Sequence, residues 1–293
     1  MKPKLSIVLA VEGAHENLPS ILANLGAPAG RPVETIVCHA ANDELTPQSL
    51  DRSRVDQLVA SRPRSRIPHL WRDGIVAASG EWVATLSAHC IPDARWLERA
   101  RELIVIHSQS VAVGGSIALD EGAKSRDRAM HVLRYLRYTP PVTATAQFEP
   151  AADNALYRRA AILEEADLLA DGFWEPSFHA RFRRKGGAMH FDQELRVVHS
   201  NRYSARAFCA QRFDHGRAFG RARAVGRGLP VRLALLLAAP VLPAAFFAKL
   251  SLAALRHPFG RRALFTALPW LLLYLAAWGA GEARGYADAL TKS

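Results

Sequence analysis

Residues 4–25 read KLSIVLAVEGAHENLPSILANL, and residues 33–38 read VETIVC. The run at 4–10 is apolar and short like a buried strand, residues 15–25 carry apolar side chains at helical spacing, and residues 33–38 again favour a strand. This order is typical of a β-α-β unit, in which a helix joins two parallel strands. The amino-terminal part of the chain therefore predicts an α/β fold.

The same alternation continues along the chain. Helical patterns at 70–79 and 94–107 alternate with strand-like runs at 80–86 and 111–117. We therefore expect a mostly parallel sheet with helices on its faces. Ligands of such sheets bind beyond the carboxyl ends of the strands, so the loops after Ala10, Cys38 and Leu86 are the places to look for chemistry.

Composition excludes several classes of protein. The 293 residues are 49% hydrophobic and 22% charged, which argues against disorder and fibrous repeats. The three cysteines form no C-x-x-C pair, so neither a disulfide scaffold nor a cysteine zinc site is expected. Lys2 and Lys4 precede only a short apolar run, which is not the pattern of a secretory signal, and we expect this part to be cytoplasmic.

The positive charge is concentrated in one segment. Residues 201–262 hold twelve basic residues and a single acid, Asp214, and so account for the whole formal charge of +11. Aromatic residues interleave with arginines at helical rhythm in residues 202–227, and Phe208 and Phe219 are spaced to share one helix face. A basic band beside apolar sequence favours an anionic membrane surface as partner. RNA is the rival, but no nucleic-acid-binding signature accompanies the band, and we expect no nucleic-acid partner.

Two apolar stretches follow, at 233–255 and 263–281. At about 1.5 Å per residue each is long enough to cross a hydrocarbon core of about 30 Å, which predicts a helical membrane hairpin. The connector RHPFGRR at 256–262 is as basic as the approach to the first stretch, and Pro240 and Pro243 would bend the first helix. An interfacial or re-entrant hairpin and a buried helical pair are the alternatives.

Five segments in order resemble family 2 glycosyltransferases of the membrane-associated bacterial branch, which have the GT-A fold. The segments are SIVLAVEGAHENLPSILANL (6–25), ETIVCHAAND (34–43), RDGIVAASGEWVATLSAHCIPDARWL (72–97), DNALYRRAAIL (153–163) and WEPSFHARFRRKGG (174–187). The resemblance implies a nucleotide-sugar-binding, Rossmann-like mixed sheet flanked by helices, followed by the carboxy-terminal helical membrane hairpin. It implies a catalytic domain at residues 1–200, a basic amphipathic connector at 201–228, and a membrane-associated helical hairpin with a tail at 229–293.

The resemblance also implies where the donor binds. The family's D-x-D motif, which holds a divalent cation and the diphosphate, falls on Ser87, Ala88 and His89, so His89 is the only candidate metal ligand there. A histidine in a loop is as readily held by backbone hydrogen bonds, so a role for Mg or Mn is open. The other residues matched to the donor side are Val11, Glu12, His39, Asp43, Arg72 and Asp73; for the last two, a surface ion pair is the competing interpretation.

Glu175 matches the catalytic base of the family. A base has to accept the proton of the acceptor hydroxyl, and Pro176 indicates that Glu175 lies at a helix start, where a carboxylate also complements the helix dipole. Asn154, Trp174 and His179 match the acceptor side. Asn154 would serve equally well as a turn residue, and His179 as a half-exposed helix residue.

The implied activity is inverting transfer of a sugar from a nucleotide-diphosphate sugar to a lipid-linked or membrane-delivered glycan, at the inner membrane with the catalytic domain in the cytoplasm. Because the D-x-D carboxylates are missing, two alternatives stay open. One is a pseudo-glycosyltransferase that acts as a membrane scaffold or regulator. The other is a metal-independent transferase in which arginines neutralise the leaving diphosphate.

Overall fold

The computed structural model describes residues 4–26, 33–43, 45, 50–142, 148–200 and 203–290. By packing, the chain divides into two compact units. The first comprises residues 1–120 and 137–202, and the second comprises residues 121–136 and 203–293. The domain limits expected from the sequence, 1–200, 201–228 and 229–293, stay a prediction.

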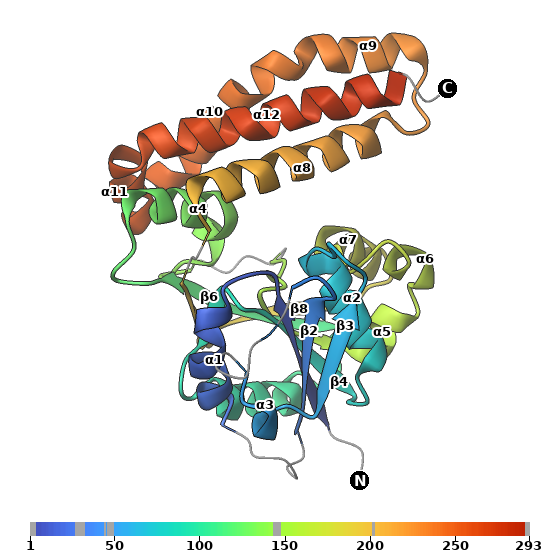
Figure 1. The fold of residues 1–293 in the computed structure, drawn as a ribbon, viewed down its shortest axis with the longest axis vertical. Coiled ribbons are helices and arrows are strands. Elements are labelled where there is room, and N and C mark those ends of the chain that lie inside the picture. The colour runs from blue at the N-terminus through green and yellow to red at the C-terminus, as the bar shows by residue number, and fades with distance from the viewer. Residues whose placement is uncertain are drawn as a thin grey trace. The chain divides into compact units, whose positions relative to one another are not determined.

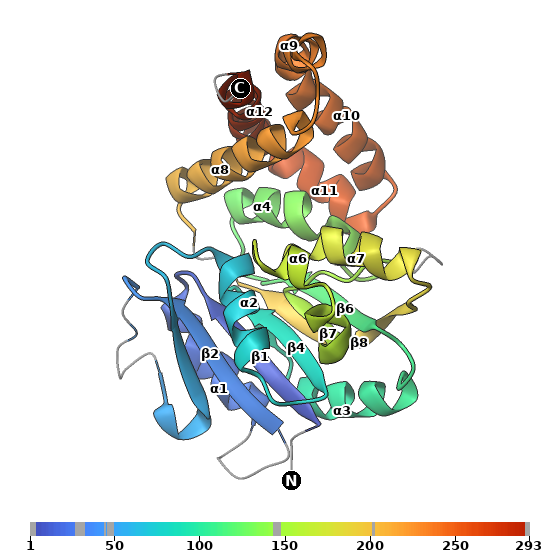
Figure 2. The same ribbon diagram turned by 90° about the vertical axis from the view of Figure 1, so that its right-hand side faces the viewer.

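An eight-stranded mixed sheet forms the centre of the first unit (Figures 1 and 2). Its strands are β1 (Leu5–Val11), β2 (Val33–Ala40), β3 (Gln57–Ser61), β4 (Trp82–Ser87), β5 (Cys90–Pro92), β6 (Ala112–Leu119), β7 (Asn154–Arg158) and β8 (Met189–His199). Their order is β3-β2-β1-β4-β7-β6-β8-β5. Strands β1 to β4 pair in parallel, whereas β7 is antiparallel to both β4 and β6. The mixed sheet flanked by helices confirms the predicted fold class.

Helices cover both faces of this sheet. They are α1 (Leu18–Leu25), α2 (Ile67–Ala77), α3 (Trp96–Ile106), α5 (Arg159–Leu163), α6 (Ala166–Leu169) and α7 (Glu175–Arg184). Figures 1 and 2 show α1 and α2 on opposite faces. Leu70, Trp71 and Ile75 of α2 pack with Val8 and Ile36 in one core cluster. At Gly74, a Cβ would lie only 2.3 Å from a Val8 methyl, so this glycine lets α2 approach the sheet.

The second unit is helical in its described part. Its helices are α4 (Ser125–Tyr135), α8 (Ala205–Ala224), α9 (Leu229–Ala238), α10 (Leu242–Leu255), α11 (Pro258–Thr266) and α12 (Leu268–Leu290). Helix α4 shares a core with Phe208, Leu271 and Tyr274. Phe208 is buried against Tyr274 and Phe219 is 41% exposed. The expectation that both phenylalanines lie on a membrane is therefore wrong for Phe208, because α12 covers it.

The two apolar stretches differ in structure. Residues 229–255 form a helix long and apolar enough to cross a membrane, and only 6% of its most apolar window is buried. A 3-10 turn at Ala239–Val241 joins α9 to α10, so Pro240 and Pro243 are accommodated without a break in the helix. The second stretch is divided between α11 and α12, which meet at 86°. Its sequence is therefore not one straight helix.

Glycines bring α8 and α12 into close contact. A Cβ on Gly281 would lie 2.0 Å from the carbonyl oxygen of Phe213, and one on Gly285 would lie 2.3 Å from that of Arg217. Gly216 and Gly220 of α8 are as tightly enclosed by α12. Only residues without a side chain allow two helix backbones to approach this closely.

A buried carboxylate also joins these two helices. Glu282 accepts hydrogen bonds from Trp278 Nε1 at 2.9 Å and from the Tyr286 hydroxyl at 2.7 Å. It also forms an ion pair with Arg223 of α8. The charge of Glu282 is thereby compensated where water does not reach it.

Candidate functional site

The loop after β1 is tied to the start of α2. The Glu12 carboxylate accepts from Arg66 Nη1 at 2.8 Å and from the backbone N–H of Ile67 at 3.2 Å. The first backbone N–H groups of a helix lack partners within it, and the N-cap residue of α2 has no capping side chain. Glu12 therefore caps α2 from another loop, which fixes the geometry at the carboxyl end of β1.

The loop after β2 is joined to the same place. Val11 is fully buried at the end of β1 and pairs with His39 of β2. Asp43 accepts from the Gly13 N–H at 3.3 Å and lies 2.9 Å from His15 Nε2. Four residues predicted for the donor side therefore lie together at the carboxyl ends of β1 and β2. They are Val11, Glu12, His39 and Asp43.

Arg72 and Asp73 lie on α2 and contact one another. Arg72 Nε donates to Asp73 at 2.7 Å, and the Ser61 hydroxyl donates to the other carboxylate oxygen at 2.6 Å. Burial raises the pKa of Asp73, but these hydrogen bonds outweigh it and the pKa is lowered overall. Asp73 is thus held ionised at the end of β3, and the expected ion pair is present.

The carboxylate of Asp153, the residue before β7, lies beside the end of β4. The Ser87 hydroxyl donates to Asp153 Oδ1 at 2.5 Å, and both side chains are buried. Asp153 immediately precedes Asn154, which pairs with Leu86 in the antiparallel β4–β7 ladder. Sequence reasoning did not assign Asp153, which lies 66 residues from Ser87, although it belongs to the DNALYRR segment.

His89 is fixed by the backbone around it. Its Nε2 lies 3.2 Å from the carbonyl oxygen of Glu12, and its own carbonyl accepts from the Ser200 N–H at 2.9 Å. Among the residues that the structure describes, no three His, Cys, Asp or Glu side chains are grouped to hold a metal ion. The side chains of Ser87 and His89 therefore do not match the oxygen-rich coordination that Mg²⁺ or Mn²⁺ prefers, and we derive no step through a cation.

Glu175 begins α7 and acts electrostatically on two buried tyrosines. Burial raises the pKa of Tyr157, and the charge of Glu175 adds to this shift; the same two effects raise the pKa of Tyr138. Asp153 contributes to both shifts as well. Glu175 and the carboxylate at the end of β4 are thus close enough to act electrostatically on the same two hydroxyls.

Two arginines, Arg137 and Arg183, add positive charge near His179. Arg183 lies 2.5 Å from a Glu149 carboxylate oxygen, and Arg137 lies 3.9 Å from the other oxygen. Both arginines lower the pKa of His179, so their charge reaches the same group of residues. Glu149, Arg137 and Arg183 were given no role from the sequence. Arg183 lies in the matched segment 174–187, but nothing in the sequence places its guanidinium beside Glu149.

The residues predicted for the acceptor side have structural partners. Both N–H groups of the Asn154 amide donate to backbone carbonyls, of Ser116 at 2.9 Å and Leu195 at 2.7 Å, and its oxygen accepts from Trp96 Nε1 at 2.8 Å. Trp174 donates its indole N–H to the Asp171 carbonyl at 3.0 Å. Asn154 thus joins β6, β7 and β8, and its role toward an acceptor stays a prediction.

His179 is buried and not half-exposed, which corrects the expectation from its place on the helix. Its Nε2 lies 3.0 Å from the Tyr157 hydroxyl, and the two rings stack. Burial, followed by the charges of Arg183 and Arg137, lowers the pKa of His179 to about 3. His179 is therefore neutral at physiological pH and positions Tyr157.

This pKa predicts acid sensitivity. The unfolded chain binds a proton at His179 below about pH 6.5 and the folded chain only near pH 3, so folding stability falls as the pH drops through that window. Between about pH 7 and pH 5, the free energy of unfolding of the unmodified chain should fall by about 2 kcal/mol more than that of His179→Gln. Denaturant titrations at the two pH values measure this. Equal losses in both proteins would contradict the assignment.

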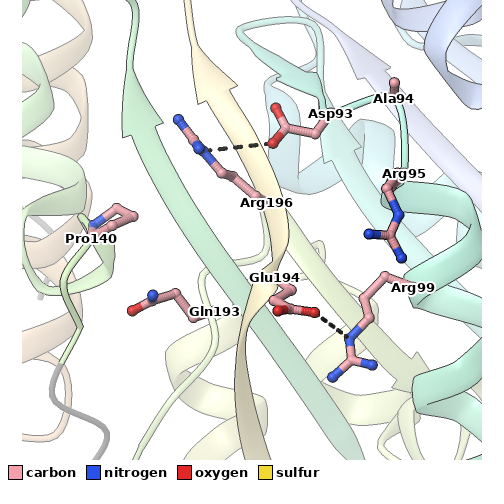
Figure 3. Close-up of a pocket in the computed structure, with 8 residues that line it drawn as sticks. All are labelled: Asp93, Ala94, Arg95, Arg99, Pro140, Gln193, Glu194 and Arg196. Atoms are coloured by element: carbon pink, nitrogen blue, oxygen red, sulfur yellow. Dashed lines mark ion pairs between the residues drawn. The ribbon is translucent and has the colours of Figure 1, made fainter.

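A separate pocket of about 500 Å³ opens beside β8 and the start of α3 (Figure 3). It is lined by Asp93, Ala94, Arg95, Arg99, Pro140, Gln193, Glu194 and Arg196. Its arginines are matched by acids: Arg99 bonds Asp192 at 2.6 Å, and Arg196 lies 3.7 Å from Asp93. None of the residues predicted for the site lines this pocket, and its balanced charge does not indicate an anion site.

No family model matches the chain, and no curated protein sequence matches it. Among solved structures, the chain is similar to a mannosyltransferase from Pyrobaculum calidifontis in complex with GDP-Man and Mn²⁺, with a TM-score of 0.53 and 15% identity over 95% of this chain and 86% of that one.

Two further structures match with lower scores. One is glucosyl-3-phosphoglycerate synthase from Mycobacterium tuberculosis, with a TM-score of 0.48 and 15% identity over 73% of this chain and 78% of that one. The other is S. aureus TarS 1-349 in complex with UDP, with a TM-score of 0.46 and 13% identity over 95% of this chain and 91% of that one. The mannosyltransferase match shows that the chain has the GT-A-type fold.

Proposed function

We propose that the chain is a family 2 type glycosyltransferase, which moves a sugar from a nucleotide-diphosphate sugar to a hydroxyl of a lipid-linked or membrane-delivered glycan, with inversion. The support for this is that Glu175, at the start of α7, and Asp153, which accepts from Ser87 at the end of β4, both raise the pKa of the buried hydroxyls of Tyr138 and Tyr157. Val11, Glu12, His39 and Asp43 at the neighbouring strand ends supply the donor side.

In the proposed step, Glu175 acts as base. The acceptor oxygen forms a bond to the anomeric carbon while the bond from that carbon to the diphosphate oxygen breaks. The proton of the acceptor hydroxyl passes to the Glu175 carboxylate, and the nucleotide diphosphate leaves. A single displacement of this kind inverts the anomeric carbon.

The leaving diphosphate needs positive charge beside it. In this chain we assign that role to Arg137 and Arg183, whose guanidinium groups can bind phosphate oxygens in pairs. This favours the metal-independent version of the transferase, because the side chains at Ser87 and His89 are a poor match for a divalent cation.

The first test is donor binding by the detergent-purified protein. We expect calorimetry with a panel of nucleotide-diphosphate sugars to find one donor that binds with micromolar affinity, on the order of 8 kcal/mol. We expect its affinity, and the transfer measured with it, to stay the same when chelator replaces Mg²⁺ or Mn²⁺. Activity that vanishes with chelator would overturn the metal-independent version.

The matched controls concern the arginines. Arg137→Gln is expected to weaken donor binding about tenfold, which is the loss of one charge-assisted hydrogen bond. Arg95 is an exposed arginine that lines the separate pocket, and Arg95→Gln should leave donor binding unchanged. If the folded protein binds no donor either with the divalent cation or with chelator, the result would favour the alternative of a pseudo-glycosyltransferase that acts as a membrane scaffold or regulator.

A further inference from the structure

The exposed face of α9 and α10 is a continuous apolar stripe. Five large side chains between 43% and 81% exposed lie on it: Leu233, Leu237, Val241, Leu252 and Leu255. At 100° per residue these positions fall within about one third of the helix circumference, and Ala245 and Ala248 fill the interval between them. This set of seven residues is called the exposed stripe below.

The opposite side of the same helices packs on α12. A Cβ on Gly279 would lie 2.5 Å from the Pro243 ring, Phe246 meets the Trp278 ring edge-on, and Arg232 donates to the carbonyl of Ala289 at 2.7 Å. The helix over 229–255 therefore lies antiparallel along α12. Figure 1 shows these helices and α8 running side by side.

Helix α8 also packs along α12 over the same length, and Trp278 of α12 contacts both Phe219 of α8 and Phe246 of α10. Phe208 contacts Tyr274, Phe213 contacts Gly281, and Arg221 contacts Asp288. Along this contact α8 carries the exposed charged residues Arg206 and Asp214. It also carries Arg221 and Arg223, which are exposed and paired with Asp288 and Glu282 of α12. If residues 229–255 crossed a bilayer, the packing within this unit would place these charges level with the hydrocarbon core, which is strongly unfavourable.

The charges around the exposed stripe indicate which surface covers it. No acidic residue occurs between His215 and Gly281. Four exposed basic residues lie on α10, directly after it and on α11, which follows it: Lys249, Arg256, Arg261 and Arg262. A second copy of the chain would present the same positive charges and be repelled. An anionic lipid surface complements both the apolar side chains and the basic ones.

We infer that α9 and α10 lie in the plane of an anionic phospholipid bilayer, with the exposed stripe inserted among the lipid headgroups and acyl chains and the basic residues at phosphate level. The helix does not cross the membrane. This inference goes beyond the proposed sugar transfer and does not depend on it, since it rests on the second unit alone.

Vesicle binding by the full chain tests the partner. We expect sedimentation with phosphatidylcholine vesicles containing phosphatidylglycerol, and much weaker sedimentation with phosphatidylcholine alone. Val241→Glu should reduce the partition coefficient about tenfold, since it removes one inserted side chain. Val105→Glu on α3 is the matched control, because Val105 is 68% exposed and Val241 is 64% exposed. Equal binding by the two variants, or self-association through the stripe in place of vesicle binding, would overturn the inference.

Labelling tests the orientation. Single cysteines at Gly228→Cys and Ala253→Cys mark the two ends of the helix at exposed positions outside the exposed stripe, in a Cys209→Ser background because Cys209 is the only native cysteine that is not buried. Gly228 tolerates a side chain, since its nearest obstacle to a Cβ is 3.8 Å away. In sealed right-side-out and inside-out membrane vesicles of the expression host, an impermeant maleimide should label both ends from the cytoplasmic side. Labelling of the two ends from opposite sides would show a spanning helix and refute the in-plane arrangement.

Discussion

Replacement of Glu175 by Gln is expected to lower the turnover of sugar transfer by about 10² to 10⁴, with donor binding nearly unchanged. The amide has almost the same shape as the carboxylate but cannot accept the acceptor proton. Glu175 lies in the first turn of α7, so the variant keeps the helix and loses only a favourable charge at its start. The rate of nucleotide diphosphate release, with the donor found by calorimetry as substrate, measures this loss of turnover.

The control separates catalysis from helix stabilisation. Glu98 also lies in the first turn of a helix, α3, and is 64% exposed beside Arg95. Glu98→Gln removes an equivalent charge outside the proposed site and should leave turnover within about twofold, because such a charge contributes under about 1 kcal/mol to stability. Full turnover by a folded Glu175→Gln protein would refute the assignment of the base.

Replacement of Gly281 by Val is expected to destabilise the helical unit by about 3 kcal/mol. The new Cβ would lie 2.0 Å from the backbone oxygen of Phe213, which cannot move without separating α8 from α12. Separation would also loosen the buried contacts of Glu282 with Arg223 and Tyr286. Thermal unfolding in detergent, followed by far-ultraviolet circular dichroism, measures the effect.

Ala280→Val supplies the comparison on the same helix. Ala280 is exposed, so the added methyl groups meet no obstacle and the expected cost is the difference in helix propensity, about 0.6 kcal/mol. By propensity alone Gly281→Val would be favourable, since Val is the better helix former. A melting temperature of Gly281→Val equal to that of the unmodified chain would therefore contradict the close packing of α8 on α12.

Much of the α/β unit could be predicted from the sequence. The strand at 4–10 appears as Leu5–Val11, and the helix at 94–107 appears as Trp96–Ile106. The Pro176 signal for a helix start next to Glu175 is also confirmed. These features depend on neighbours in the sequence, because apolar spacing and the fixed φ of proline act over a few residues.

The position of Asp153 beside Ser87 could not be predicted in this way. It depends on the register of β4 against β7, in which Leu86 pairs with Asn154, 68 positions further along the chain. The same holds for His179, whose burial is decided by Tyr157 on another element. A helical pattern indicates which residues share a face but not what that face meets.

The membrane segment shows the same difference between what the local sequence predicts and what tertiary contacts decide. Apolar composition and length by themselves predict that residues 233–255 form a helix suited to lipid, because both are properties of one segment, and the structure has this helix at 229–255. Whether that helix can cross a bilayer depends on what packs along it, and the tertiary structure aligns α12 and the charged α8 beside it through contacts such as Gly281 with Phe213. The free energy of moving those charges into hydrocarbon belongs to the packed unit, and so only the tertiary structure decides between crossing the membrane and lying in its plane.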